Sequence, residues 1–303
     1  MKRTLHLAGL ALLLAAATAQ TPARAADSFS QQRLNWNAPM KPFRVIDDIY
    51  YVGMGDTSAW LIYTLQGFIL IDGGLPESAA PIEANIKTLG FNIKDVKIIL
   101  NSHAHFDHAG GLAKLKRDSG ARLIASEGDK PILEKGRIAF GPSAAPEDDY
   151  PPVKVDRTVK DGDTVFLGGV TLTAHITPGH TPGATSWTMP IVAGGQNHTV
   201  VFFSSITVAG NPLVNNKAYP QVVDDYKTGF ARLKAIDADV FLAPHADQMG
   251  LAKKAATLQE NTDKKVLNAP NPFIDKAEFH RVVGNMEKQF DDALAKQQAG
   301  GKP

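Results

Sequence analysis

Apolar residues are arranged along the chain in two successive blocks, each with β-type runs first and helical spacing later. The β-type runs of the first block are rich in Ile, Val and Tyr. They predict strands at residues 43–52, 59–65, 68–71, 96–100 and 122–125. Residues 77–89 have the spacing of an amphipathic helix that stops at Gly90. A second helix is expected to begin near His108 and to run through Lys116.

The second block repeats this order. Strands are predicted at residues 164–167, 170–176, 184–189, 199–204 and 240–242. Helices are predicted at residues 222–236 and 275–298, the latter with Asp275 as N-cap and Glu278 as its capping-box partner. Residues 136–152, rich in Gly and Pro, predict a long loop. Because no long polar linker interrupts the chain, we expect one α/β domain with two sheets face to face and helices outside.

The N-terminus has the pattern of a secretory signal peptide. Two basic residues precede an apolar run from Leu5 to Ala17, and a small-x-small site ends at Ala25. The run is short for a membrane span, which disfavours the alternative of a membrane anchor. We therefore expect residues 1–25 to be a signal peptide and residues 26–303 to be a single domain.

Composition narrows the classes of function. The 32 basic and 31 acidic side chains provide no strong field for nucleic acid or an anionic membrane. The absence of Cys excludes disulfides, thiol nucleophiles and thiolate metal sites, so any metal site must use nitrogen and oxygen ligands. A secreted chain without Cys favours a bacterial periplasm. We expect a monomer that acts on a small molecule.

Ligand-type side chains are densest just after the predicted strand at residues 96–100. His103, His105, Asp107 and His108 fall within six residues and precede two glycines. Burial of these side chains without partners would be costly, so core packing explains them poorly. One zinc ion takes about four ligands, one of them water in a catalytic site. Four candidates here, with further histidines downstream, suggest two metals that share the segment.

The pattern His103-x-His105-x-Asp107-His108 resembles the signature of the metallo-β-lactamase superfamily. Three further stretches resemble its other motifs in the same order, Leu70-Ile-Asp72-Gly-Gly74, Thr177-Pro-Gly-His180-Thr-Pro-Gly183 and Ala243-Pro-His245. The resemblance covers nearly all of the expected mature domain and implies an αβ/βα sandwich with a dinuclear zinc site on its rim.

The same resemblance implies how the two zinc ions are held. The first zinc ion would bind His103, His105 and His180. The second would bind Asp107, His108 and His245, and Asp107 would also orient a hydroxide. The other histidines of the expected mature domain, at positions 175, 198 and 280, are not expected to be ligands, and those at 198 and 280 are expected at the surface.

The residues at the end of the strand after His180 help to distinguish the enzyme classes within the superfamily. Many of its hydrolases, glyoxalase II and many lactonases among them, place a bridging Asp there, whereas this chain has Ser204 and Ser205 without an acidic neighbour. That pattern is similar to subclass B3 of the metallo-β-lactamases. The resemblance also implies that Ser205 and Thr207 contact the substrate carboxylate. The alternative is that both residues only terminate the strand.

The resemblance therefore implies zinc-dependent hydrolysis of the β-lactam amide bond by a metal-bound hydroxide, and with it antibiotic resistance. One alternative is a periplasmic lactonase or thioester hydrolase on the same scaffold, which the missing bridging Asp disfavours. Another is a non-catalytic zinc-binding or solute-binding protein, which the full ligand set disfavours. Two further questions stay open: whether Asp72 holds the metal loop or only orders a turn, and whether Trp60 and Phe140 line the groove or the core.

Overall fold

The computed structural model describes residues 31–267 and 269–302. Within this range, the residues from Asn35 onward form one compact unit, and residues 31–34 fall outside it. The predicted signal peptide, residues 1–25, lies outside the described residues and stays a prediction, as does the single domain over residues 26–303.

The first half of the compact unit contains a seven-stranded mixed sheet whose strands follow chain order. The strands are β1 (Phe43–Ile46), β2 (Ile49–Tyr51), β3 (Trp60–Thr64), β4 (Gly67–Ile71), β5 (Val96–Leu100), β6 (Arg122–Ser126) and β7 (Arg157–Val159). Strands β1 to β4 pair antiparallel, whereas β4 to β7 pair parallel. The apolar runs of β4 and β5 are almost wholly buried, as parallel strands covered on both faces require. Because these strands are parallel, the loops that leave their carboxyl ends meet at one edge.

The second half contains a five-stranded sheet in the order β12-β11-β10-β9-β8. Its strands are β8 (Thr164–Leu167), β9 (Val170–Ile176), β10 (Thr185–Ala193), β11 (Gln196–Phe202) and β12 (Val240–Leu242). Only β11 and β12 pair parallel. The two sheets meet in one core, where the Trp60 ring of β3 lies 6.3 Å from the Phe202 ring of β11.

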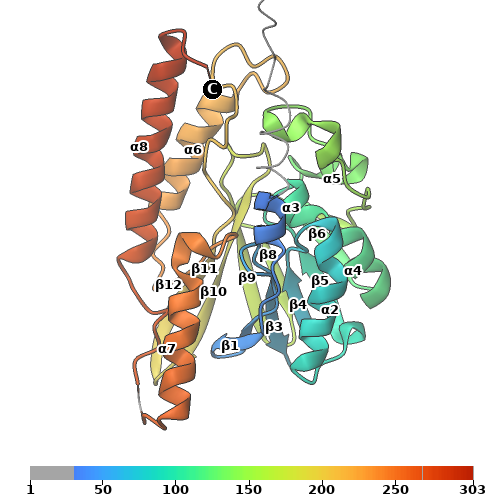
Figure 1. Cartoon of the computed structure of the whole chain (residues 1–303), viewed down its shortest axis with the longest axis vertical. Helices are drawn as coiled ribbons and strands as arrows, with labels where there is room; N and C mark the ends of the chain where they lie inside the picture. The colour runs from blue at the N-terminus through green and yellow to red at the C-terminus, as the bar shows by residue number, and fades with distance from the viewer. Residues whose placement is uncertain (1–30, 268, 303) are drawn as a thin grey trace, which may run out of the picture. The chain divides into compact units, whose positions relative to one another are not determined.

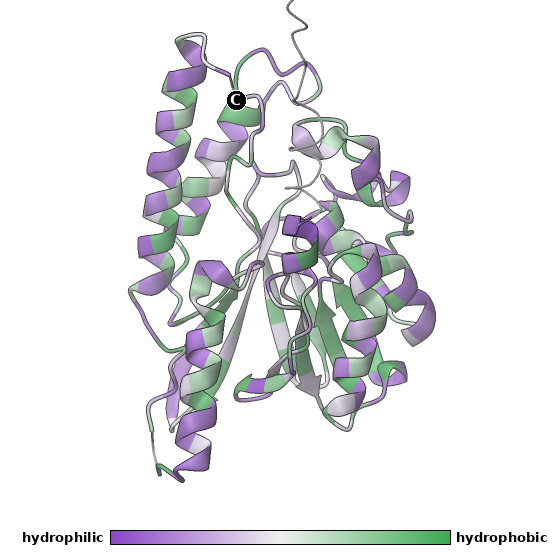
Figure 2. Cartoon of the chain, in the orientation of Figure 1, coloured by the Kyte–Doolittle hydropathy of each residue, from purple (hydrophilic) through white to green (hydrophobic). Residues whose placement is uncertain are grey.

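Helices cover the outer faces of both sheets. On the side of the first sheet lie α2 (Ala79–Thr88), α3 (Phe106–Ala109), α4 (Leu112–Ser119) and α5 (Lys130–Lys135), and on the other side lie α6 (Val222–Lys234), α7 (Leu251–Asp263) and α8 (Glu278–Gln298) (Figure 1). Hydrophilic positions are frequent along these helices, while the strands of the first sheet are largely hydrophobic (Figure 2). Within the described ranges, no helix has both the length and the apolar character that a bilayer span needs. The predicted sandwich of two sheets with helices outside is confirmed.

The structure corrects the predicted helix that begins near His108. Helix α3 begins at Phe106 and ends before a glycine pair, after which α4 begins at Leu112. The backbone of Gly73 donates to the His108 carbonyl at 2.8 Å, and a Cβ on Gly111 would lie 2.2 Å from the Gly73 oxygen. The glycine pair therefore lets the loops after β4 and β5 touch backbone to backbone, and this contact divides the helix.

Other boundaries differ in smaller ways. The segment predicted as one strand at residues 43–52 is the β1–β2 hairpin, and β7, α5 and α7 carry no prediction. The last helix begins at Glu278, with Ala277 as its N-cap. The Glu278 carboxylate pairs with Lys254 instead of closing a capping box. Asp275 Oδ1 accepts from the Ala277 backbone at 3.0 Å, so this side chain caps a turn just before α8 and not the helix itself.

Candidate metal centre

The six predicted ligand side chains come together at one edge of the two sheets. The loop after β5 carries His103 and His105, and the short helix α3 that follows carries Asp107 and His108. The other two come from the β9–β10 loop and the loop after β12. Five of the six are buried, and His245 is half-buried. Segments 75 and 137 residues apart thus meet in one cluster.

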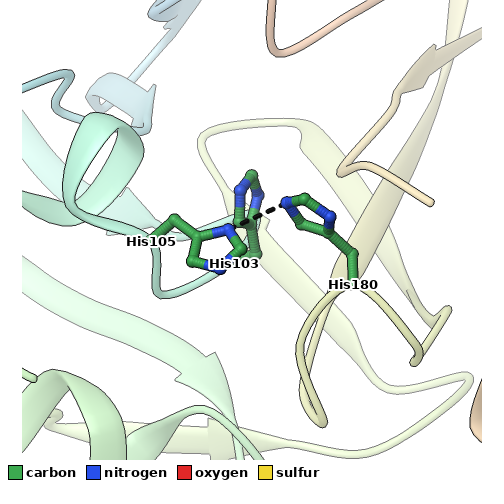
Figure 3. Close-up of side chains that lie close together, drawn as sticks. All are labelled: His103, His105 and His180. Atoms are coloured by element: carbon green, nitrogen blue, oxygen red, sulfur yellow. Dashed lines mark hydrogen bonds between the residues drawn. The ribbon is translucent and has the colours of Figure 1, made fainter. Parts of the chain in front are cut away.

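His103, His105 and His180 form the first group, with their rings turned toward one another (Figure 3). His105 Nδ1 lies 2.8 Å from His180 Nε2. His103 Nε2 is buried and has no hydrogen-bond partner among the described residues. Burial lowers the pKa of His103 and His180 well below the usual value, and that of His105 to about 4. Three neutral imidazoles therefore offer lone pairs to one point, as a metal site requires.

The orientation of His180 is set from outside the group. Its Nδ1 lies 2.7 Å from the Thr207 carbonyl oxygen. A carbonyl can only accept a hydrogen bond, so Nδ1 carries the proton and Nε2 keeps its lone pair. The lone pair then faces His105, which is the arrangement that a metal ligand needs.

Asp107, His108 and His245 form the second group. Asp107 Oδ2 lies 3.3 Å from His108 Nε2 and 3.4 Å from His245 Nε2, and the two nitrogens are 3.2 Å apart. Zinc–ligand bonds of about 2.0–2.1 Å give ligand–ligand separations of about 3.3 Å around a tetrahedron. The three donor atoms therefore already have the spacing of three corners of a zinc site.

The charges of the second group also suit a cation. Burial opposes the charged carboxylate, but His108 and His245 hold the pKa of Asp107 well below its usual value. Burial also opposes a charged His245, yet hydrogen bonds to Asp107 and Asp56 raise its pKa to about 10. The surroundings thus favour a positive charge beside His245 Nε2, where a metal ion would stand. The residues present fit a metal with nitrogen and oxygen ligands.

Asp56 is a site residue that the sequence analysis missed. Its Oδ2 accepts from His245 Nδ1 at 2.9 Å, and its Oδ1 accepts from the Asp247 backbone at 3.1 Å. This contact leaves His245 Nε2 to face Asp107, just as the Thr207 carbonyl orients His180. The Trp36 ring, also missed, lies 5.6 Å from the His245 ring. Asp56 belongs to no recognisable local motif, and it is 189 residues from its partner His245 in the sequence.

The geometry favours the reading in which Asp72 holds the metal loop. Its Oδ1 accepts from the Ser102 backbone at 2.7 Å and from Asn101 Nδ2 at 3.1 Å. Its Oδ2 lies 3.9 Å from His108 Nδ1. The backbone of Asp72 is left-handed, with φ 63°, an unusual conformation that the surrounding contacts maintain.

The corner at the end of β11 lies against the first group. Ser204 Oγ donates to the Ser102 carbonyl at 3.0 Å, so this side chain joins the two halves of the fold. Ser205 Oγ is 3.3 Å from Thr207 Oγ1, which is 3.3 Å from His180 Nδ1. Ser205 and Thr207 thus stand beside the candidate metal ligands, and neither position is acidic.

The aromatic candidates for the groove belong to the core instead. Trp60 is buried and packs edge-on against Tyr51, with ring centroids 5.1 Å apart. Phe140 is buried against Tyr219 at 4.9 Å. His198, expected at the surface, is also buried, with its Nδ1 3.7 Å from Asp239 Oδ2.

Comparison with known proteins identifies the fold family. A family model described as the metallo-β-lactamase superfamily matches residues 52–192. The chain is 46% identical to BJP-1, a subclass B3 metallo-β-lactamase of Bradyrhizobium japonicum, with a TM-score of 0.82 over 88% of this chain and 98% of that one. It is 36% identical to the FEZ-1 metallo-β-lactamase from Legionella gormanii, with a TM-score of 0.81 over 86% of this chain and 98% of that one.

The curated relatives are named for an activity other than that of a β-lactamase. The hydroxyacylglutathione hydrolase of Rhodospirillum rubrum is 33% identical over 108 residues, which are 36% of this chain and 34% of that protein. The protein of the same name from Brucella anthropi is 31% identical over 140 residues, 46% of this chain and 45% of that protein. The chain spans less than half the length of these relatives. Similarity to these two metallo-β-lactamase structures over 98% of their length, together with the candidate metal cluster, shows that the chain belongs to the metallo-β-lactamase superfamily.

Proposed function

We propose that this superfamily hydrolase is a β-lactamase of the B3 type, which opens the β-lactam amide bond with two zinc ions. The observation that carries the proposal is the neutral corner after β11, where Ser204 and Ser205 stand in place of a bridging carboxylate. The similarity to BJP-1, a subclass B3 metallo-β-lactamase, over 98% of its length supports the same reading.

Each of the two ligand groups would hold one zinc ion. His103, His105 and His180 would hold one zinc ion, and Asp107, His108 and His245 would hold the other. When bound, these ions supply an activated water molecule and polarise the carbonyl oxygen of the substrate. Asp107 would orient the attacking water, since it is the one carboxylate among the six ligands. The hydroxyls of Ser205 and Thr207 donate to the substrate carboxylate.

Thioester hydrolysis is the second candidate, because the curated relatives are hydroxyacylglutathione hydrolases. The test compares three substrates with the purified, zinc-loaded protein: a chromogenic cephalosporin, a hydroxyacylglutathione thioester and an acyl-homoserine lactone. We expect the cephalosporin to be cleaved far faster than the other two, and chelation of the metal to abolish its cleavage. Turnover of the thioester without cleavage of the cephalosporin would replace the first proposal by the second.

We also propose that the protein works in the bacterial periplasm and confers resistance to β-lactam antibiotics. The pattern of residues 1–25 supports export, and the subclass B3 similarity supports resistance. Expression of the whole chain in a susceptible bacterium should raise the β-lactam concentration that stops growth. N-terminal sequencing of the periplasmic protein should show that residues 1–25 are gone, whereas an intact N-terminus would contradict the signal peptide.

The number of metal ions follows from the two groups of three ligands. We expect close to two zinc ions per chain after dialysis against buffer with trace zinc. Elemental analysis, normalised to protein concentration, provides the measurement. A reproducible value near one in fully active protein would show that the Asp107 group does not hold its own ion.

Ser205→Ala tests the substrate corner. Because Ser205 lies beside the ligands and not among them, its loss should mainly raise KM and leave zinc content unchanged. Ser204→Ala is the matched control, since Ser204 bonds to the Ser102 carbonyl and should affect stability more than KM. Loss of one zinc ion in Ser205→Ala would mean that this hydroxyl is a ligand.

A further inference from the structure

Asp129 lies beside the loops of the three-histidine group, outside every motif that identified the site. It is the N-cap residue of α5 and is almost wholly buried. Its carboxylate accepts three hydrogen bonds. Oδ2 accepts from the Ala104 backbone at 2.9 Å and from Thr181 Oγ1 at 2.8 Å, and Oδ1 accepts from the Gly183 backbone at 2.8 Å.

These three donors belong to the two loops that carry the group. Ala104 stands between His103 and His105, in the loop after β5. Thr181 follows His180 directly, and Gly183 closes the same β9–β10 loop. One carboxylate therefore joins a loop of the first sheet to a loop of the second.

Neighbouring residues allow Asp129 to lie close to both loops. A Cβ on Gly183 would lie 2.2 Å from the Asp129 backbone nitrogen, so only glycine allows the approach. The Ala104 carbonyl accepts from Tyr150 Oη at 2.8 Å, so both polar backbone groups of Ala104 are held by side chains from elsewhere. Unlike Asp129, Tyr150 makes this contact with the first loop alone.

We propose that Asp129 is a positioning residue that fixes the separation of His105 from His180, and through it the metal affinity of the three-histidine group. The proposal rests on the metal-binding part of the proposed function, and it is independent of which substrate is hydrolysed. The facing nitrogens of His105 and His180 are only 2.8 Å apart, so a small shift of either loop changes the site. Partners that orient the ligands of a metal commonly change its affinity about 10- to 100-fold when they are removed.

Only a carboxylate satisfies all three donors. An amide has one acceptor oxygen and one donor nitrogen. In Asp129→Asn the Thr181 hydroxyl can rotate to accept, but either the Ala104 or the Gly183 backbone N–H must then face another donor. One loop therefore has to move away from the other.

The experiment measures metal binding without any substrate. The whole mature chain, stripped of metal, is titrated with Co²⁺ against a competing chelator, and the absorption bands of the bound ion report its ligand geometry. In folded Asp129→Asn we expect the affinity of the tightest site to fall about 10- to 100-fold and the bands to change. Thr181→Val removes one of the three hydrogen bonds and should give a smaller fall. Asp237→Asn makes the same chemical change at an exposed position outside both loops. It is the matched control and should leave affinity and bands close to those of the unaltered protein.

The outcomes separate positioning from a purely structural role. A role in stability alone would lower the unfolding midpoint of the metal-free Asp129→Asn protein but leave its affinity and bands unchanged, and that result would overturn the proposal. If Asp129→Asn does not fold, Thr181→Val decides in its place: a lower affinity supports the proposal and an unchanged affinity overturns it. Failure of the unaltered protein to bind Co²⁺ would overturn the metal centre as well, whereas failure to cleave a β-lactam would overturn only the proposed activity.

Discussion

Asp107→Asn is expected to lower kcat on the order of 10²-fold or more while the chain stays folded. The substitution keeps the shape of the side chain but removes the one carboxylate of the ligand set. Asp107 Oδ2 lies within 3.4 Å of both imidazole nitrogens of its group, so its charge is central there. The second zinc ion should bind more weakly, and the attacking water should lose its orienting acceptor.

The measurement for Asp107→Asn combines kcat, zinc content and circular dichroism. Asp237→Asn, at an exposed position before β12, makes the same chemical change away from the candidate ligands and should leave all three unchanged. Near-native turnover in folded Asp107→Asn would mean that other groups carry the chemistry. An unfolded variant would mean that Asp107 is chiefly structural.

Gly111→Ala is expected to destabilise the metal-free protein by about 3 kcal/mol, at the upper end of what overpacking costs. The added Cβ would lie 2.2 Å from the Gly73 backbone oxygen, and backbone cannot move aside as a flexible side chain can. The loop after β4, which includes Gly73 and Asp72, would have to separate from the loop after β5. We therefore also expect weaker metal binding.

Urea unfolding of the metal-free protein provides the test of Gly111→Ala. The free energy of unfolding is compared between variants, together with the slope of that free energy against urea concentration. Gly284→Ala is the matched control, because a Cβ at this position in α8 meets no described atom within 4 Å. It should stabilise the protein by about 1 kcal/mol or less, as alanine does in a helix interior. A Gly111→Ala protein as stable as the unaltered one would contradict the contact between the two loops.

Local sequence patterns were sufficient to predict many of the strands and helices of the fold. The predicted bounds of β5, β8, β9 and β12 coincide with those in the structure. Each is a short run of strand-forming residues whose period leaves little choice of boundary. Helix α7 was missed because only Leu251 among its thirteen residues is buried, which leaves a weak apolar pattern. Strand β7 was missed because only Val159 of its three residues is buried, whereas all three residues of β12 are apolar and buried.

The candidate ligands could be predicted because four of them share one short segment and the others lie in recognisable motifs. The residues that orient them could not. Asp56 meets His245 across 189 residues, and Asp129 meets Thr181 across 52. Both are ordinary acidic residues in their local sequence, and only the assembled fold shows which donors they accept. The division of the predicted helix near His108 has the same origin, because a contact with Gly73 causes it.

The crowding of four candidate ligands into six residues also affects the unfolded chain. His103, His105, Asp107 and His108 stay close in sequence when the fold is lost, so denatured protein keeps a chelating stretch. His180 and His245, 75 and 137 residues from their partners, join only on folding. A metal stabilises a fold through the difference between its affinities for the folded and unfolded forms. Stability should therefore rise with metal concentration and then level off, at a ceiling set by how well the unfolded segment competes for the ion.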